Sequence, residues 1–341
     1  MAEAKPSFEE ELRTILSAIT IISPSSFTLA GQMMPVNELM APAASSMAQN
    51  PAIVTQLQDC LYQYCYCRRF QPGFMNQLPT DPVAADSSFL AQLSQANRSN
   101  SRWDMGWVVR RSEPTGQIWA EKGGVNRMFS PGEFVNYNGP GSPVNTGTVV
   151  GAYIAKESTT VQPGCYFAFG ETISSSGYFD IVRFYWNIDS AGIGQLVQIV
   201  TRDLNRFQVP FQFKCPVYPQ AYFRRDAAVL YVNKRYYFLV RELVTAWLQE
   251  CEKCLQDDVP LFTLPLDKGI GLAEDPATGE SFGINRCRHV AEAIWKAHSK
   301  EVPQSERLPA VVQHFREHGL DFQRPYLNAG SIDQYNSRAA A

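Results

Sequence analysis

The sequence has no apolar run long enough to span a bilayer, and it does not open with the basic-then-apolar pattern of a cleaved secretion signal. It also has little net charge, because 30 Lys and Arg residues stand against 33 Asp and Glu residues, a formal charge of -3. Such a chain has no overall field that would attract nucleic acid or an acidic membrane. We therefore expect a cytoplasmic protein with neither partner, although a disordered type III secretion signal would leave no such mark.

Signatures of nucleotide and metal binding are also missing. There is no Walker loop and no GxGxxG segment after a strand, which weighs against a nucleotide or sugar-phosphate enzyme. The eight cysteines include a CxxC spacing at Cys251 and Cys254, but it lies in an amphipathic helical pattern with no second pair nearby. We expect buried thiols, no metal and no cofactor.

Residues 1–100 are predicted to form a helical N-terminal region, and residues 101–341 a second, α+β domain. The helical spacing of apolar residues begins at Phe8, and a segment rich in Pro, Ser and Met is predicted to be a loop or lid. The expected elements of this region are helices from Phe8, at 55–69 and at 86–97, with the loop at 24–51.

From Arg102 the period changes to that of strands separated by Gly, Pro and Asn loops. The predicted strands are 103–109, 117–121, 148–154, 165–169, 179–188, 209–214 and 227–232. Helices are predicted at 191–205, 236–255, after Ser281 and at 309–318. The expected class is α+β, with a helical N-terminal part, a mainly antiparallel curved sheet and a helical C-terminal part.

Two predicted strands each combine an apolar face with a polar one. Side chains alternate along a strand, so Arg183, Tyr185 and Asn187 share one face of the first strand. Gln212 and Lys214 share the polar face of the second. A sheet with cations, amides and phenols on one face can line a cleft for an anion, which indicates a phosphate-bearing ligand.

The helix that begins near Phe282 carries Arg286 and Arg288 in its first turns, where the helix dipole disfavours cations. A bound anion would relieve that repulsion. Glu274 and Asp275 are the rival partners, and a structural salt bridge is as good an interpretation for any single arginine. The argument for a ligand rests on the excess of cations over acids in this half of the chain: Arg183, Lys214, Arg224, Arg225, Arg286 and Arg288 against Asp226, Glu274 and Asp275.

Lys214 is the residue with the potential to act as a base. Its amine would have to lose a proton near neutral pH, and lowering a lysine pKa from about 10.4 to roughly 7 takes about 4–5 kcal/mol. Apolar neighbours and nearby arginines act in that direction. The competing interpretation is a lysine that extends from an edge strand into solvent.

Several of these segments together resemble a known family. The matching segments are Arg183–Ile188, Pro210–Cys215, Arg224–Val232 and the run from Val259 to Arg288. They resemble the HopA-type III secretion effector family over roughly residues 100–300. That family includes plant-pathogen effectors and proteins from biosynthetic clusters for ribosomal peptides such as class V lanthipeptides and thioamitides.

The resemblance implies a fold similar to phosphothreonine lyases and a role as a lyase. In the biosynthetic members, an aminoglycoside-phosphotransferase-type kinase phosphorylates Ser or Thr of a precursor peptide. The HopA-like partner then eliminates phosphate to leave dehydroalanine or dehydrobutyrine. No metal or redox cofactor is needed for this reaction.

By the same resemblance, Lys214 is the expected base, with Arg183, Arg225 and Arg286 as phosphate ligands. Lys122, at a strand end beside Gly123, is a second candidate base. No histidine precedes His289, so the general acid is His289 or Tyr185, unless phosphate leaves as a dianion without one. The remaining predicted site residues are Arg224 and Arg288 as phosphate ligands, and Asn187, Gln212, Asp226, Glu274 and Asp275 in support.

Two other functions stay open on the sequence alone. A translocated type III effector or a non-catalytic interaction module would use the same cationic face to bind a phosphopeptide without turnover. The amphipathic pattern from Phe8 to Ile22 favours a protein that is not secreted, because it leaves little room for a long Ser-rich leader.

Overall fold

The computed structural model describes residues 7–35, 51–72, 86–139, 141–173, 180–276 and 278–336. Three antiparallel sheets and the helices around them make an α+β protein, as the sequence predicts. The predicted strands are divided between two of these sheets instead of forming a single one.

The N-terminal region mixes helices with a small sheet. Ser7 caps the first helix, since its hydroxyl accepts from the Glu10 N–H while the Glu10 carboxylate accepts from the Ser7 N–H. Asp86, the first residue of the predicted helix 86–97, caps the third helix, since its side chain accepts from the Ser88 and Phe89 N–H groups. The elements are α1 (Phe8–Ala18), β1 (Ile19–Ser23), β2 (Ser26–Leu29), β3 (Gln32–Pro35), α2 (Ala52–Leu61), the π-helix η2 (Tyr62–Tyr66) and α3 (Ser87–Ala96).

The loop prediction for 24–51 is wrong over 26–29 and 32–35, where β2 and β3 pair in register. Phe27 and Leu29 alternate with partly buried residues and are themselves buried. Two strands of four residues are too short for a period to stand out against a composition rich in Pro, Ser and Met. Residues 36–50 of the predicted loop lie outside the described residues.

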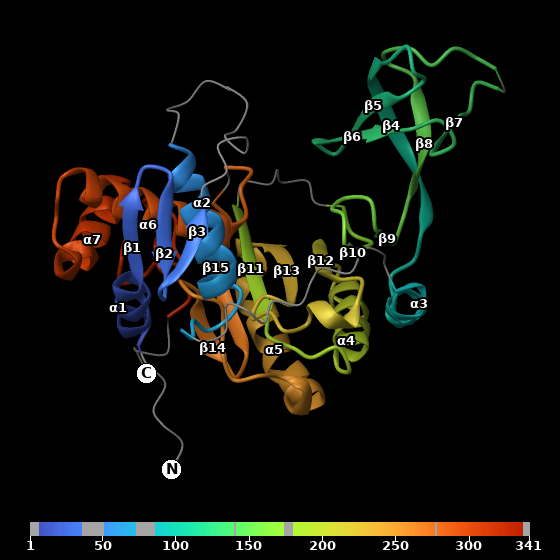
Figure 1. The fold of residues 1–341 in the computed structure, drawn as a ribbon. Helices are drawn as coiled ribbons and strands as arrows, with labels where there is room; N and C mark the ends of the chain where they lie inside the picture. The colour runs from blue at the N-terminus through green and yellow to red at the C-terminus, as the bar shows by residue number, and fades with distance from the viewer. Residues whose placement is uncertain are drawn as a thin grey trace.

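Five strands form a separate sheet with its own small core, which includes Trp107, Ile118 and Val150. Figure 1 shows it standing apart from the rest, joined through the ends of β4 and β8. Its strands are β4 (Arg102–Ser112), β5 (Ile118–Lys122), β6 (Val125–Phe129), β7 (Phe134–Asn136) and β8 (Val149–Ile154), in the order β6-β5-β4-β8-β7.

The central sheet has seven strands in the order β14-β15-β11-β13-β12-β10-β9. Its strands are β9 (Glu157–Ser158), β10 (Cys165–Phe169), β11 (Ile181–Trp186), β12 (Phe211–Pro216), β13 (Ala228–Asn233), β14 (Leu264–Asp267) and β15 (Ile270–Glu274). The sequence does not predict β14 and β15, because Pro265 and Gly271 are typical strand breakers. All of β15 is buried, so it shows no alternation.

Helices cover both faces of the central sheet. On one face Phe184 stacks on Tyr237 and Trp186 packs on Trp247. On the other, Tyr185 contacts η2 and the N-terminal end of α6. The helices are α4 (Ile193–Arg206), α5 (Tyr237–Cys251), α6 (Phe282–Ser299) and α7 (Arg307–Glu317), and the short 3-10 turns are Pro219–Ala221, Lys234–Tyr236, Glu252–Cys254 and Gln304–Glu306.

The first and last parts of the chain share the main hydrophobic core with the central sheet. Arg307 of α7 donates to the carbonyls of Leu16 and Ile19, which fixes α7 against the end of α1. The predicted division between residues 100 and 101 stays a prediction.

Candidate functional site

The polar face predicted from the sequence exists on the central sheet. Strand β13 lies between β11 and β12, and Tyr231 of β13 is opposite both Arg183 and Gln212. In the next row, Tyr185 and Lys214 flank the same residue of β13. Directly opposed residues share a face of the sheet. Four of the predicted site residues are therefore on one face, with the apolar alternates on the other.

The π-helix η2 and the start of α6 press onto this face. The ring centroid of Tyr66 lies 6.5 Å from that of Tyr185, and that of Phe282 lies 6.3 Å from Tyr185. Such close approach needs glycine at position 283, because a Cβ there would lie 2.5 Å from the Tyr66 ring. Single π-helical turns are frequent at functional sites.

Two phenols meet in this layer without strong partners. Tyr66 and Tyr185 are 1% and 2% exposed, and neither hydroxyl makes a well-formed hydrogen bond to a described residue. Burial raises the pKa of both phenols, so both are protonated at neutral pH. Tyr185 is thus in the form that the predicted role of general acid requires, but it is deeply buried.

Arg183 is buried against a carboxylate. Its Nε donates to Asp275 Oδ2 at 2.8 Å, and its guanidinium lies 5.1 Å from the Tyr231 ring centroid. Burial alone lowers the pKa of Arg183, but Tyr185, Tyr231 and Asp275 raise it overall. Arg183 therefore forms a structural salt bridge with Asp275, one of the two interpretations left open by the sequence.

Arg286 does not face an anion site. It is 1% exposed, and it donates to the carbonyls of Pro325 at 2.7 Å and Leu327 at 2.8 Å. Burial lowers its pKa to about 10. Arg286 therefore holds the segment after α7 against α6, with carbonyl dipoles in place of a carboxylate.

Arg288 is also engaged by acids. It pairs with Glu280 and Glu292, each at 3.0 Å. Glu274 is buried and pairs with Lys234 at 2.8 Å. The predicted rivals Glu274 and Asp275 thus neutralise other cations, and the acid that sequence reasoning missed is Glu280, whose position just before the helix cap Ser281 is the available signal.

Arg225 and Asn187 are structural as well. Arg225 is 3% exposed and pairs with Glu11 of α1 at 3.0 Å and with Asp258 at 3.6 Å. The Asn187 side chain donates to the Asp258 carbonyl at 2.9 Å. These contacts tie α1 and the 255–260 segment to the sheet.

Arg224 is held at the edge of the polar face. Its Nε and Nη2 donate to the two carboxylate oxygens of Asp226, both at 2.9 Å, and Nη2 also donates to the Tyr62 hydroxyl at 2.9 Å. Burial alone lowers the pKa of Arg224, but Asp226 reverses this and raises it. The guanidinium is oriented by Asp226 and is only partly buried.

Arg68, which the sequence patterns do not single out, lies beside Arg224. Its guanidinium is 4.4 Å from the Phe223 ring centroid, and burial lowers the pKa of Arg68, with Arg224 adding to the effect. Arg68 has no carboxylate partner in the described part of the chain. The available signal is its place next to Arg69, just after the aromatic residues of η2 and near the end of the predicted helix 55–69.

Lys214 completes a group that we term the cationic cluster: Arg68, Lys214 and Arg224. Lys214 is half-buried and forms no ion pair or hydrogen bond with a described residue. Lys214 and Arg224 both lie near Cys165. Burial raises the pKa of the Cys165 thiol, and these two cations act to lower it. Three cations against the single carboxylate of Asp226 leave two excess positive charges here, which is what a phosphate dianion requires.

Lys122 and His289 are not brought to this face. Lys122 ends β5 of the five-stranded sheet, where its Nζ contacts both Asp104 oxygens at 2.8 and 2.9 Å. His289 lies between α6 and α7, 3.4 Å from His314. Burial lowers its pKa to about 3, and Arg288 adds to this.

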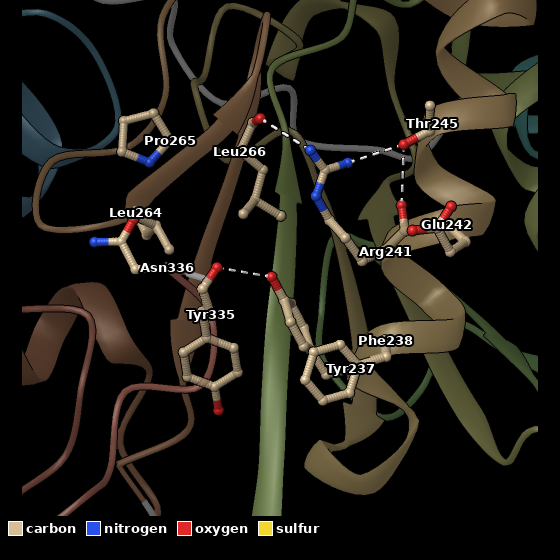
Figure 2. Close-up of a pocket in the computed structure, with 10 residues that line it drawn as sticks. All are labelled: Tyr237, Phe238, Arg241, Glu242, Thr245, Leu264, Pro265, Leu266, Tyr335 and Asn336. Atoms are coloured by element: carbon tan, nitrogen blue, oxygen red, sulfur yellow. Dashed lines mark hydrogen bonds between the residues drawn. The ribbon is translucent and has the colours of Figure 1, made fainter. Parts of the chain in front are cut away.

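A surface cavity of about 310 Å³ lies elsewhere, between α5 and β14. In Figure 2, Arg241 crosses it and donates to the Leu266 carbonyl and to Thr245. Tyr237 at its base donates to the Tyr335 carbonyl at 3.1 Å. Since Tyr237 stacks on Phe184, this hollow is on the side of the sheet opposite Lys214.

Comparison with protein families shows which family the chain belongs to. The model of the HopA1 effector protein family matches residues 156–327, half of the sequence. The chain belongs to the HopA1 effector protein family. The match covers the central sheet and α6, and so includes Lys214 and Arg224 but not Arg68.

Two solved structures of effector proteins are similar to this HopA1 family member. The effector from Pseudomonas syringae pv. tomato strain DC3000 is 14% identical, with a TM-score of 0.45, and the match covers 85% of this chain and 93% of that one. The effector from Pseudomonas syringae pv. syringae strain 61 is 15% identical, with a TM-score of 0.41, over 82% and 96%. No curated protein matches the chain. No helix in the described ranges has the length and apolarity needed to cross a membrane.

Proposed function

We propose that this HopA1 family protein is a phospho-Ser/Thr lyase that eliminates phosphate from a phosphorylated peptide to give dehydroalanine or dehydrobutyrine. The observation that carries the proposal is the cationic cluster. A half-buried lysine without an acidic partner among the described residues lies near Cys165, as does Arg224, which Asp226 orients, and Arg68 lies next to Arg224. Base and phosphate ligands are the two components that the reaction needs.

The reaction is a β-elimination. The Lys214 amine takes the α-proton, the electrons of that C–H bond form the Cα=Cβ double bond, and the Cβ–O bond breaks with its electron pair leaving on phosphate. The Arg68 and Arg224 guanidiniums bind the phosphate oxygens and stabilise the charge that develops there. With phosphate held by two cations, its departure needs no contribution from His289, which lies in the α6–α7 seam.

The family resemblance supports the biological setting that we propose. The substrate is a precursor peptide of a ribosomal natural product, phosphorylated by an aminoglycoside-phosphotransferase-type kinase, and the protein works in the cytoplasm. In a pathogen the same chemistry would serve an effector secreted through a type III system.

A second candidate is a phosphopeptide-binding module without turnover. It is favoured by the pairing of Arg183, Arg225 and Arg288 with acids, which leaves fewer groups for catalysis than the sequence suggests. The cationic cluster alone would then serve to recognise a phosphoryl group.

The deciding experiment is mass spectrometry of a phosphothreonine peptide incubated with the purified protein. We expect loss of phosphoric acid and a product that adds thiols. The Lys214→Ala variant should lose turnover by about 10³-fold, within the range of general-base catalysis, while it still binds the peptide. Lys122→Ala tests the rival base and should retain turnover, because Asp104 already holds that amine.

Each outcome decides between the candidates. If Lys122→Ala abolishes turnover and Lys214→Ala retains it, the base is Lys122 of the five-stranded sheet. An intact peptide that binds with and without added kinase would establish the binding module instead.

A further inference from the structure

Three of the four histidines in the chain converge on one point between α6 and α7. They are His289 of α6, His314 of α7 and His318 just after α7, and Glu292 of α6 joins them. One ligand atom from each of the four side chains lies within 4.8 Å of every other.

The distances within this histidine cluster suit a metal ion. His314 Nε2 is 3.2 Å from Glu292 Oε2 and 3.4 Å from His289 Nδ1, and His289 Nδ1 is 3.9 Å from Glu292 Oε2. Ligands bound tetrahedrally at 2.0–2.1 Å from zinc are about 3.3 Å apart. Three of the four donors therefore already form a triangle close to one face of a zinc coordination tetrahedron.

In His318 and Glu292, the atom that does not face the cluster forms a hydrogen bond, and this bond orients the atom that does. His318 Nδ1 donates to the His314 carbonyl at 2.8 Å, which leaves His318 Nε2 unprotonated and able to ligate. Arg288 Nη1 donates to Glu292 Oε1 at 3.0 Å and leaves Oε2 facing the histidines. Such outer contacts to a carbonyl and a carboxylate are what orient ligands in metal sites.

We propose that His289, Glu292, His314 and His318 bind one Zn²⁺ ion. Three imidazoles and one carboxylate form a nitrogen-rich donor set that favours zinc over calcium or magnesium, which prefer oxygen ligands. This site is separate from the cationic cluster and does not depend on the lyase activity.

The bound ion would cross-link the two C-terminal helices. His289 and His314 are buried at the seam, while His318 is exposed and offers a path for the ion to enter. With protein groups for all four positions, the site resembles closed structural zinc sites and not catalytic ones, which keep a position open. Its expected effect is on stability.

The test uses the full-length protein after removal of metals with a chelator and dialysis into buffer with micromolar free zinc. We expect about one zinc per chain by elemental analysis and a melting temperature raised by about 5 °C. The exposed His318→Ala variant should fold normally by circular dichroism and bind zinc at least about tenfold more weakly. The matched control is His298→Ala, because His298 lies in α6 but outside the cluster. This variant should bind zinc as tightly as the wild type does.

A cobalt titration separates this site from the cysteines, because cobalt bound to nitrogen and oxygen lacks the charge-transfer absorption of thiolate ligands. Zinc retention below about one tenth of an equivalent would overturn the proposal. So would equal zinc affinity in His318→Ala and the wild type, or a thiolate spectrum, since either would place the ion elsewhere.

Discussion

The central sheet and the five-stranded sheet use lysine in opposite ways. Lys122 ends a strand in the five-stranded sheet and is bound by Asp104. Lys214 lies in a strand of the central sheet, is half-buried and has no acidic partner among the described residues. Both lysines have strand positions that sequence reasoning treats alike. The difference teaches that a lysine becomes a candidate base when the fold places no carboxylate beside its amine.

The two sheets also differ in how they are covered. Helices pack on both faces of the central sheet, whereas Trp103, Trp119 and Met128 of the five-stranded sheet are 48%, 41% and 47% exposed. The ion pairs of Arg183 and Arg225 beside the central sheet are accordingly more buried than that of Lys122 in the five-stranded sheet. The following predictions test that contrast, beginning with the largest expected effect.

Replacing Arg225 with Met should lower the free energy of unfolding by about 3–5 kcal/mol, because Glu11 would be left largely buried without its cation. The matched change Lys122→Met breaks a more exposed pair and should cost about 1 kcal/mol or less. Urea unfolding measures both variants. Similar losses in the two would show that the sheets do not differ in electrostatic burial.

Arg68→Ala should weaken binding of a phosphothreonine peptide by about 10- to 100-fold, since a charged hydrogen bond is worth about 1.5–3 kcal/mol. Arg110→Ala on the five-stranded sheet, whose half-exposed guanidinium pairs with Glu121, is the control and should leave binding unchanged. Isothermal titration calorimetry with the Lys214→Ala background avoids turnover during the measurement. Unaltered affinity in Arg68→Ala would remove it from the anion site.

Gly283→Ala should destabilise the protein by about 1–3 kcal/mol, because the new methyl group would overlap the Tyr66 ring. Gly194→Ala in α4 adds the same methyl group where no atom lies within 4 Å, and should stabilise by up to about 1 kcal/mol. Thermal unfolding compares the two. If both variants gain stability, the packing of η2 on α6 is looser than the structure indicates.

Stability should fall with acid through Glu274, and this effect is expected to be the smallest. Burial acts to raise the Glu274 pKa, but bonds from Lys234, Ser331 and Asn328 lower it below its usual 4.5. The folded state thus holds this proton less tightly than the unfolded state, so the stability it contributes is present above pH 4.5 and is lost as pH falls below that value. Glu274→Gln should reduce the slope of the unfolding free energy against pH below pH 4.5. An unchanged slope would show that Glu274 does not contribute to this pH dependence.

Local patterns in the sequence predict much of the fold. Alternation in Arg183–Asn187 and Gln212–Lys214 correctly divides polar from apolar faces, and the Asp86 cap marks the start of α3. Period and capping are properties of neighbouring residues, so a sequence displays them directly. The strands β2 and β3 are too short for an alternation to stand out in the sequence, and the fully buried β15 has none, which is why they escape prediction.

Ion pairing and convergence were decided only by the tertiary structure. Arg183 meets Asp275 across 92 residues and Arg225 meets Glu11 across 214, so no local pattern could reveal which arginines are neutralised. The same applies to Arg68 beside Arg224, and to the histidines that α6 and α7 bring together. The sequence by itself determined which residues share a strand face or a helix. Which charges remain available for chemistry was settled by folding, because that depends on contacts between distant segments.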